Sequence, residues 1–317
     1  MSTSMAWDIE DRAIEDRTVP KLAFAVLAIA LFYVVSHSQA LRAEGSDHEP
    51  AGFTVIAEYD ASAPPPSDPP RRCSGGGILS GCWFDSDPNR THSLVAVSTA
   101  PRSPNGVFQF KVPAGQQPGI GVGMIEAWDS PETSPNQYSA VYESGWVRVP
   151  TSTFEMQAVG VKFLGYAGVG EAYPTNINPV QMYFGSDNWS GTGDAAVLSE
   201  TNVDLFQAGA GVDRRIAANV VTDRVFTFGT WHHYEFVMVL NDIGVANGTF
   251  KMWWNGTLIS NHADIAYRSS KYSSGFFGRR FHLVWGGQGG RNHSRDDYVQ
   301  WDHIYMSGVK CSSPGCT

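Results

Sequence analysis

Apolar and polar residues alternate in short segments along most of the chain after residue 50. In the segment 231–241, for example, Tyr234 and Phe236 alternate with His233 and Glu235. This period of two is typical of a β-strand that buries one face. The pattern predicts strands at 53–59, 107–112, 121–128, 138–149, 158–166, 180–185, 201–207, 224–228, 231–241, 248–255, 281–285 and 298–307.

The predicted strands follow one another without helical segments between them, so antiparallel pairing is expected. So many short strands predict an all-β sandwich of two packed antiparallel sheets, formed as a single domain over residues 41–317. The Pro-rich segment 61–70 (ASAPPPSDPP) is expected to be a surface loop of this domain, because proline is excluded from central strands.

Two Asn-Gly pairs, Asn247-Gly248 and Asn255-Gly256, bracket one of the predicted strands. Asn-Gly readily adopts the positive φ angles of a type I′ hairpin turn. The sequence therefore predicts a meander formed by 231–241, 248–255 and the segment that follows.

Alternation also predicts which side chains face the core. The inward set on the first two strands of the meander is Tyr234, Phe236, Met238, Leu240, Phe250, Met252 and Trp254. On the last strand, Trp301, His303 and Tyr305 are expected on one face, opposite Asp302, Ile304 and Met306.

Charge and composition narrow the class of partner. The formal net charge is −9 and only 17% of residues are charged, with no dense block of Lys or Arg. A nucleic-acid binder needs a positive field to displace counterions, so nucleic acid is set aside as a partner.

The segment before residue 41 predicts export. An uninterrupted apolar run at 22–35 follows Lys21, and small residues at 38–40 suit a cleavage site. The run is shorter than the roughly 20 residues of a bilayer span and matches the apolar region of a signal peptide. The preceding residues are rich in Asp and Glu, unlike a basic signal start, so 1–40 is read as a signal peptide or an N-terminal anchor. The protein is then secreted, or held at the cell surface if the segment is uncleaved.

The four cysteines form two close pairs, Cys73/Cys82 and Cys311/Cys316. An even number of cysteines in an exported chain predicts disulfides, and local pairing within each pair is the first choice. Crossed pairing remains open. Zinc is disfavoured, because neither pair has the C-x-x-C spacing and no histidine is suitably interleaved.

A recurring pattern surrounds the meander. It comprises Trp-His-His-Tyr-Glu at 231–235, Met-Trp-Trp-Asn-Gly at 252–256, the Gly-rich 285–290 and the segment 296–308, with 142–148 and 160–163 upstream. Together these segments resemble concanavalin A-like jelly-roll proteins related to polysaccharide lyases and laminin G-like glycan-binding modules. The resemblance covers about residues 100–308 and implies a jelly-roll sandwich that recognises carbohydrate. It leaves the activity open, because this fold hosts lectins, hydrolases, lyases and adhesion modules.

The residues opposite the inward set are the candidates for ligand binding. They are Arg148, Lys162, Glu235, Trp253 and Asn255 as substrate-binding residues, with His233 and Lys251 on the same predicted face. Aromatic rings stack on the apolar faces of sugars, and cations or amides read their hydroxyls and carboxylates. The competing interpretation is a convex, solvated sheet face.

The candidate chemistry is proton transfer. A polysaccharide lyase must neutralise a uronate carboxylate and remove the neighbouring proton, and His233, Lys251 and Tyr183 are the catalytic candidates. Retaining glycosidases of this fold resemble one another in a strand motif that carries paired carboxylates. This motif is absent from the sequence, which disfavours hydrolysis by a retaining glycosidase mechanism. No cofactor is required. Asp302, with Asp296 or Asp297, is a candidate ligand set for a structural Ca²⁺, and a capped turn is the alternative.

Three functions remain open. The first is a secreted carbohydrate-recognising sandwich, with polysaccharide lyase activity on an anionic polymer as its enzymatic form. The second is a non-catalytic lectin or adhesin at the cell surface. The third is a structural surface protein that packs against copies of itself. Whether the protein is an enzyme, and its oligomeric state, are left open.

Overall fold

The computed structural model describes residues 47–59, 82–85, 92–118, 121–127, 137–155, 161–167, 180–184, 196–197, 203–206, 213–216, 220, 225–268, 270, 273, 275–276, 278–285, 291–313 and 316. Residues 45–317 form one compact unit. The apolar run at 22–35 and the Pro-rich segment 61–70 lie outside the described residues. Across those described ranges there is no helix that is long and apolar enough to cross a membrane.

The described chain is built from β-strands and their connections. The strands are β1 (Thr54–Tyr59), β2 (Cys82–Asp85), β3 (His92–Val95), β4 (Val107–Val112), β5 (Gly121–Ala127), β6 (Tyr138–Arg148), β7 (Val161–Ala167), β8 (Val180–Phe184), β9 (Ala196–Val197), β10 (Val203–Phe206), β11 (Asp213–Ile216), β12 (Val225–Phe226), β13 (His232–Val239), β14 (Gly248–Trp254), β15 (Thr257–Ile265), β16 (Gly278–Trp285) and β17 (Asp297–Lys310). β2, β3, β9 and β11 were not expected from the sequence. β15 is the third segment of the predicted meander, and the other strands overlap predicted segments.

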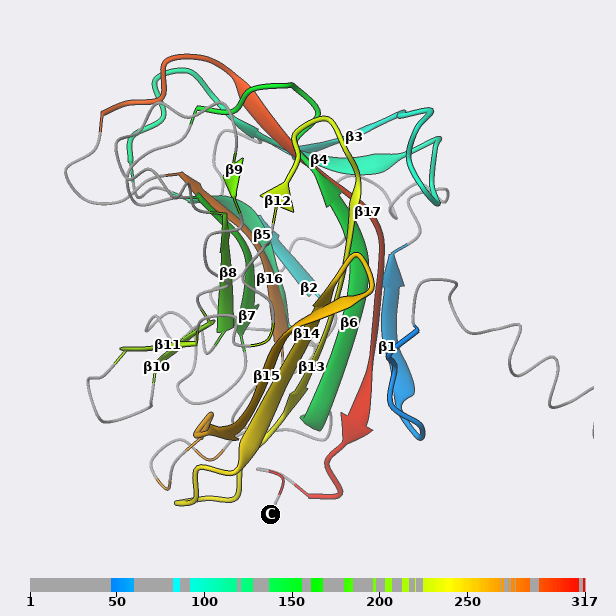
Figure 1. Ribbon diagram of the computed structural model, residues 1–317, viewed down its shortest axis with the longest axis vertical. Helices are drawn as coiled ribbons and strands as arrows, with labels where there is room; N and C mark the ends of the chain where they lie inside the picture. The colour runs from blue at the N-terminus through cyan, green and yellow to red at the C-terminus, as the bar shows by residue number, and fades with distance from the viewer. Residues whose placement is uncertain are drawn as a thin grey trace, which may run out of the picture. The chain divides into compact units, whose positions relative to one another are not determined.

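Two sheets account for most of the strands (Figure 1). The eight-stranded sheet has the order β15-β14-β13-β6-β17-β4-β3, with β1 paired to the second half of β17. The five-stranded sheet has the order β2-β5-β16-β7-β8, and two short ribbons pair β10 with β11 and β9 with β12. All of these pairings are antiparallel, which confirms the predicted all-β antiparallel fold.

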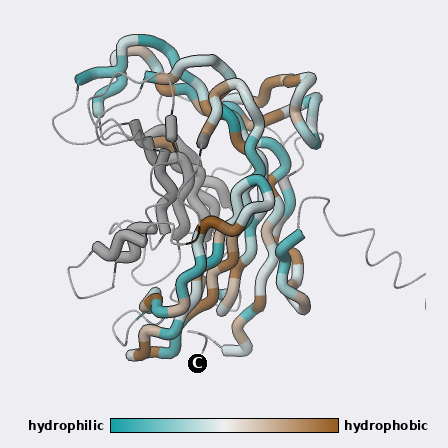
Figure 2. Tube along the Cα trace, viewed as in Figure 1, coloured by the Kyte–Doolittle hydropathy of each residue, from teal (hydrophilic) through white to brown (hydrophobic). Residues whose placement is uncertain are grey.

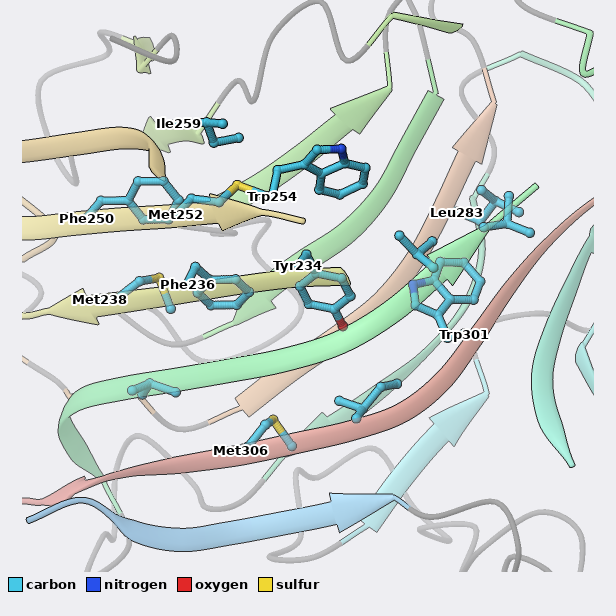
Figure 3. Close-up of a cluster of buried hydrophobic side chains, with 14 of the residues drawn as sticks. Tyr234, Phe236, Met238, Phe250, Met252, Trp254, Ile259, Leu283, Trp301 and Met306 are labelled. Atoms are coloured by element: carbon cyan, nitrogen blue, oxygen red, sulfur yellow. The ribbon is translucent and has the colours of Figure 1, made fainter. Parts of the chain in front are cut away.

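The hydrophobic core lies on one face of the eight-stranded sheet. The predicted inward residues of β13 and β14 are buried there, among them Phe236, Met252 and Trp254. Leu283 of the five-stranded sheet belongs to the same cluster, so the two sheets share this core (Figure 3). Figure 2 shows polar positions interrupting apolar ones along the strands, as expected when only one face of a sheet is packed.

The hairpin turn between β14 and β15 forms as predicted. Its two residues, Asn255 and Gly256, have φ angles of 49° and 77°, and a type I′ turn requires positive φ at both positions. The predicted meander of β13, β14 and β15 is confirmed by the strand order.

The other Asn-Gly pair does not form a hairpin turn, and that prediction is wrong. Gly248 is the first residue of β14, and a Cβ there would lie 2.7 Å from the carbonyl oxygen of Ile265. Glycine is therefore needed at this position for close backbone packing rather than for positive φ. The side chain of Asn247 instead fixes the loop, through its Oδ1 to the Asp242 amide and its Nδ2 to the Asp242 carboxylate, both at 2.8 Å.

A β-bulge overturns the predicted alternation on β17. His303 has a φ of 42°, and the pairing with β6 shifts between Asp302 and Tyr305. A bulge inserts one residue and moves the following side chains to the other face. Trp301, Ile304 and Met306 all join the core cluster as a result, and the expected pairing of Trp301 with Tyr305 on one face is wrong.

The C-terminal disulfide is confirmed. Cys311 and Cys316 are bonded, with their Cα atoms 4.8 Å apart. The guanidinium of Arg268 donates to the carbonyl of Cys316 and connects this end of the chain to the loop after β15. Cys82 begins β2 and Cys73 lies outside the described residues, so the Cys73–Cys82 pairing stays a prediction.

Candidate functional site

The face of the eight-stranded sheet that points away from the core carries most of the candidate residues, and we call it the outward face. Strand pairing arranges its residues in rows across the sheet. The first row is Gln109, Gln300 and Arg148; the second is Asp302, Trp146 and His233; the third is Tyr305, Ser144, Glu235 and Trp253; the fourth is Ser307, Tyr142, Val237 and Lys251. Successive rows are about 7 Å apart, since two residues of a strand rise by that distance.

Arg148, in the first row, is held in place from several sides. Its Nε donates to Gln300 at 2.7 Å, its Nη1 donates to Thr99 at 3.0 Å, and its guanidinium lies 4.8 Å from the ring centroid of Trp231. Burial lowers the pKa of Arg148, although an arginine in a protein remains cationic at neutral pH. No hydrogen bond within the described residues uses its Nη2, which leaves a fixed cationic donor on a partly exposed surface.

Glu235, in the third row, is fully buried and accepts several hydrogen bonds. Its Oε1 accepts from the Tyr142 hydroxyl at 2.7 Å and from the amide of His48 at 3.1 Å. Its Oε2 lies 2.8 Å from His48 Nδ1. Burial, followed by the charge of Glu235, raises the pKa of Tyr142 far above its ordinary value, so this hydroxyl remains a donor. Glu235 was expected to contact substrate directly, and the structure places it beneath His48.

Residues 47–50, which we call the N-terminal strap, cross the outward face. The ring of His48 stacks on Trp253, with centroids 4.3 Å apart and an interplanar angle of 13°. Glu49 accepts a hydrogen bond from the Tyr305 hydroxyl at 2.9 Å. Burial and the hydrogen bond to Glu49 raise the pKa of Tyr305 to about 12. The strap therefore contacts β13, β14 and β17.

His233 lies beside this network in the second row. Its ring packs against Trp146 with centroids 4.7 Å apart, and its Nδ1 is 3.8 Å from Glu235 Oε2. Lys251, which was predicted with it as a catalytic residue, is exposed in the fourth row. His233 and Lys251 thus share the outward face as expected.

Asn255 was expected to contact substrate, and its amide is used within the protein. Its Oδ1 accepts from the backbone amide of His233 at 3.0 Å, and its Nδ2 lies 3.1 Å from His232 Nδ1. These contacts fix the hairpin turn against β13. The side chain therefore positions His233.

Lys162 and Tyr183 lie in the other sheet. They are direct Cα partners across β7 and β8 in the five-stranded sheet. The expectation that Lys162 shares one sheet face with Arg148 and His233 is wrong, because alternation predicts the face of a strand but not the sheet that the strand joins.

Asp302 holds a loop in place. Its carboxylate accepts from the backbone amides of Arg102 at 2.7 Å and Ser103 at 3.1 Å, in the connection between β3 and β4. This arrangement is the capped turn that was the alternative to a calcium site. The described ranges contain no group of three or more His, Cys, Asp or Glu residues that could hold a metal ion, and Ca²⁺ binding at Asp302 remains a prediction.

Asp297 joins the loop before β17 to the loop after β6. Its Oδ2 accepts from the Glu155 amide at 2.6 Å and lies 3.2 Å from His293 Nε2, and its Oδ1 accepts from Arg295 at 3.1 Å. Burial by itself would raise the pKa of Asp297. The contacts with His293, the Glu155 amide and Arg295 outweigh burial, and the pKa lies below its ordinary value.

We expect Asp297→Asn to lower the free energy of unfolding by about 1–3 kcal/mol at pH 7, because a buried amide donor loses its charged acceptor. A carboxylate with a depressed folded-state pKa stabilises the fold above its unfolded pKa, near 4, and this stabilisation disappears as the pH falls through the folded value. The difference between wild type and variant should therefore shrink below about pH 4. Urea unfolding between pH 7 and pH 3 measures it, with the exposed Asp47→Asn as the control. A difference that does not depend on pH would contradict this account.

Comparisons with known proteins add the following. No protein-family model and no curated protein match the sequence. An endo-β-1,4-glucuronan lyase from the fungus Trichoderma reesei is 11% identical, with 81% of this chain and 96% of that chain covered and a TM-score of 0.47. An alginate lyase from a Chlorella virus is 13% identical, with 69% and 89% covered and a TM-score of 0.45. A carbohydrate esterase from the Shiga toxin-encoding bacteriophage phi24B is 12% identical, with 82% and 100% covered and a TM-score of 0.43.

These solved structures include polysaccharide lyases, the class that the sequence resembles. Their TM-scores lie below 0.5, so the likeness carries no weight in assigning a reaction to this chain. The assignment below depends on the residues of the outward face.

Sequence reasoning missed part of this network. Alternation places Tyr142 and Trp146 on the same face as Arg148, but neither was selected as a site residue. His48 lies in a short segment without periodicity, and no local pattern connects it to Glu235, 187 residues away.

Proposed function

We propose that this protein is exported, binds an acidic polysaccharide on its outward face and cleaves it by β-elimination. The observation that carries the proposal is Arg148, whose guanidinium is fixed by Gln300, Thr99 and Trp231 and keeps Nη2 clear of hydrogen bonds within the described residues. A planar, fixed guanidinium is suited to recognise a carboxylate, because its donors match the two carboxylate oxygens.

The aromatic residues support a sugar as the ligand. Trp231, Trp146 and Trp253 are partly exposed and lie beside successive rows of the outward face. Indole rings present broad apolar surfaces on which the C–H faces of sugar rings can stack. Lys251 adds a second, exposed cation in the fourth row. A polymer that carries carboxylates at intervals could stack its sugar rings on the indoles and pair its carboxylates with the two cations.

Export is supported by two features. The apolar run at 22–35 resembles a signal peptide, and the Cys311–Cys316 disulfide suits an oxidising compartment. The protein would then meet polysaccharide outside the cell, in secreted form or at the cell surface.

A second location for the same chemistry is the five-stranded sheet. Lys162 and Tyr183 are paired across β7 and β8, and a β-elimination needs a cation near the uronate and a group that transfers the proton. If the reaction takes place on the five-stranded sheet, the outward face of the eight-stranded sheet binds other parts of the polymer or does not bind it.

The test is to incubate residues 41–317 with a panel of anionic and neutral polysaccharides. Ultraviolet absorbance reports the unsaturated ends that β-elimination creates, and gel retardation on the same panel reports binding. We expect retardation and new absorbance with at least one uronate polymer and neither with neutral polymers. Gel retardation without new ultraviolet absorbance would indicate a lectin or adhesin. No change in either measurement would favour the structural surface protein.

A further inference from the structure

His48 lies at the end of a buried chain of hydrogen bonds on the outward face. The Tyr142 hydroxyl donates to Glu235 Oε1, and Glu235 Oε2 contacts His48 Nδ1 at 2.8 Å. The side chain of Glu235 is 1% exposed, and that of His48 is 31% exposed. The network thus leads from the interior of the protein to a histidine at its surface.

We propose that His48 is the group that transfers the proton in the elimination, with Glu235 and Tyr142 as its positioning residues. This inference rests on the proposed function and names a residue that neither the sequence pattern nor the strand alternation selects. It places the reacting part of the polymer beside the N-terminal strap, next to the partly exposed ring of His48.

The contacts of His48 determine which of its nitrogens can react. When Nδ1 carries the hydrogen and donates to Glu235, Nε2 keeps its lone pair and acts as the base. No hydrogen bond within the described residues uses Nε2. The carboxylate also stabilises the imidazolium that forms when Nε2 accepts a proton, as the acidic member of a catalytic triad does for its histidine.

The other contacts hold the ring still. The imidazole lies flat on Trp253, at an interplanar angle of 13°, and the backbone amide of His48 donates to the carboxylate that its ring contacts. A base that is fixed by packing and by two hydrogen bonds loses little freedom when substrate binds. Burial raises the pKa of Tyr142, so its hydroxyl keeps its proton and remains a donor to Glu235.

The proposed step balances without a co-reactant. Nε2 of His48 takes the proton from the ring carbon that bears the uronate carboxyl group. The electron pair of that C–H bond becomes a carbon–carbon double bond, and the bond from the next carbon to the glycosidic oxygen breaks. The imidazolium then returns the same proton to the leaving oxygen, which regenerates the neutral histidine.

The cations of the outward face divide between two carboxylates of the polymer. Lys251 is one row from Trp253 and is the cation nearest to the reacting uronate along the sheet. Arg148 is two rows from the row of Glu235, or about 13 Å by the rise of the strand, so it holds a carboxylate further along the polymer.

The test compares His48→Ala with wild type and with His262→Ala, a histidine of β15 outside the network. Protein spanning residues 41–317 is used, with the uronate polymer that it cleaves fastest in the panel. We expect the absorbance rate of His48→Ala to fall by about 100-fold or more, as for the loss of a general base. Gel retardation should change by less than about threefold, and added imidazole should restore part of the rate, which a merely structural residue would not permit.

Other outcomes overturn the inference in recognisable ways. A rate within about threefold of wild type would show that another group transfers the proton. Stronger gel retardation together with a faster absorbance rate would show that His48 blocks a sugar-binding position on Trp253. If wild type cleaves no polymer at all, the proposed function fails and this inference fails with it. Glu235→Gln, which keeps the size of the side chain but removes its charge and replaces one acceptor oxygen with a donor, should shift the pH–rate profile, and an unchanged profile would remove Glu235 from its role.

Discussion

Replacing Trp301 with alanine is expected to lower the free energy of unfolding by about 3–5 kcal/mol, the range for truncating a fully buried tryptophan. Trp301 is 0% exposed and belongs to the core cluster that the two sheets share. Its ring meets Phe110 edge-on, with centroids 5.0 Å apart. Leu283 of the five-stranded sheet belongs to the same cluster (Figure 3), so removing the ring opens a cavity in the core that the two sheets share.

Urea unfolding followed by circular dichroism measures this loss. Trp301→Phe is the milder variant in case the alanine variant does not fold, and it should lose less than the alanine variant. Val239→Ala is the control, because Val239 is 36% exposed on the outward face. A loss below about 1 kcal/mol for Trp301→Ala would contradict the shared core.

Replacing Arg148 with alanine is expected to weaken binding of an acidic polysaccharide by about 10- to 100-fold, because hydrogen bonds to a charged group contribute about 1.5–3 kcal/mol. The loss should be greatest at low salt, since part of the attraction is electrostatic. Arg148→Lys keeps the charge but loses the planar guanidinium, which Gln300 and Thr99 hold in place. It should therefore recover only part of the affinity.

Gel retardation at several polymer concentrations measures these affinities. Lys310→Ala is the matched control, because it removes the same charge from an exposed position at the end of β17. Equal losses for Arg148→Ala and Lys310→Ala would mean that the polymer responds to overall charge. No loss for Arg148→Ala would remove the observation on which the proposed function rests.

Local patterns predicted the parts of the fold that depend on local forces. The period of two placed Phe236 and Met252 in the core, and the preference of Asn-Gly for positive φ predicted the turn at Asn255. The same reasoning failed at Gly248, where the requirement for glycine comes from the carbonyl of Ile265 on a neighbouring strand. A sequence pair alone does not distinguish these two uses of glycine.

Features that depend on tertiary pairing were not predictable from one sequence. The bulge at His303 shifts the register of β17 and reverses the predicted face of Tyr305. Lys162 has the right period for a binding face, but its strand joins the five-stranded sheet. His48 reaches Glu235 only because the N-terminal strap crosses the outward face, which is a contact without any local signal.

The central claim is that the polysaccharide binds the outward face of the eight-stranded sheet. Amide hydrogen exchange, with and without an oligosaccharide of the polymer that the protein retains, tests it most directly. The account predicts slower exchange in β6, β13, β14 and the N-terminal strap, with no change in β7, β8 and β16. Slower exchange confined to β7, β8 and β16 would contradict it and would move the site to the sheet that carries Lys162 and Tyr183.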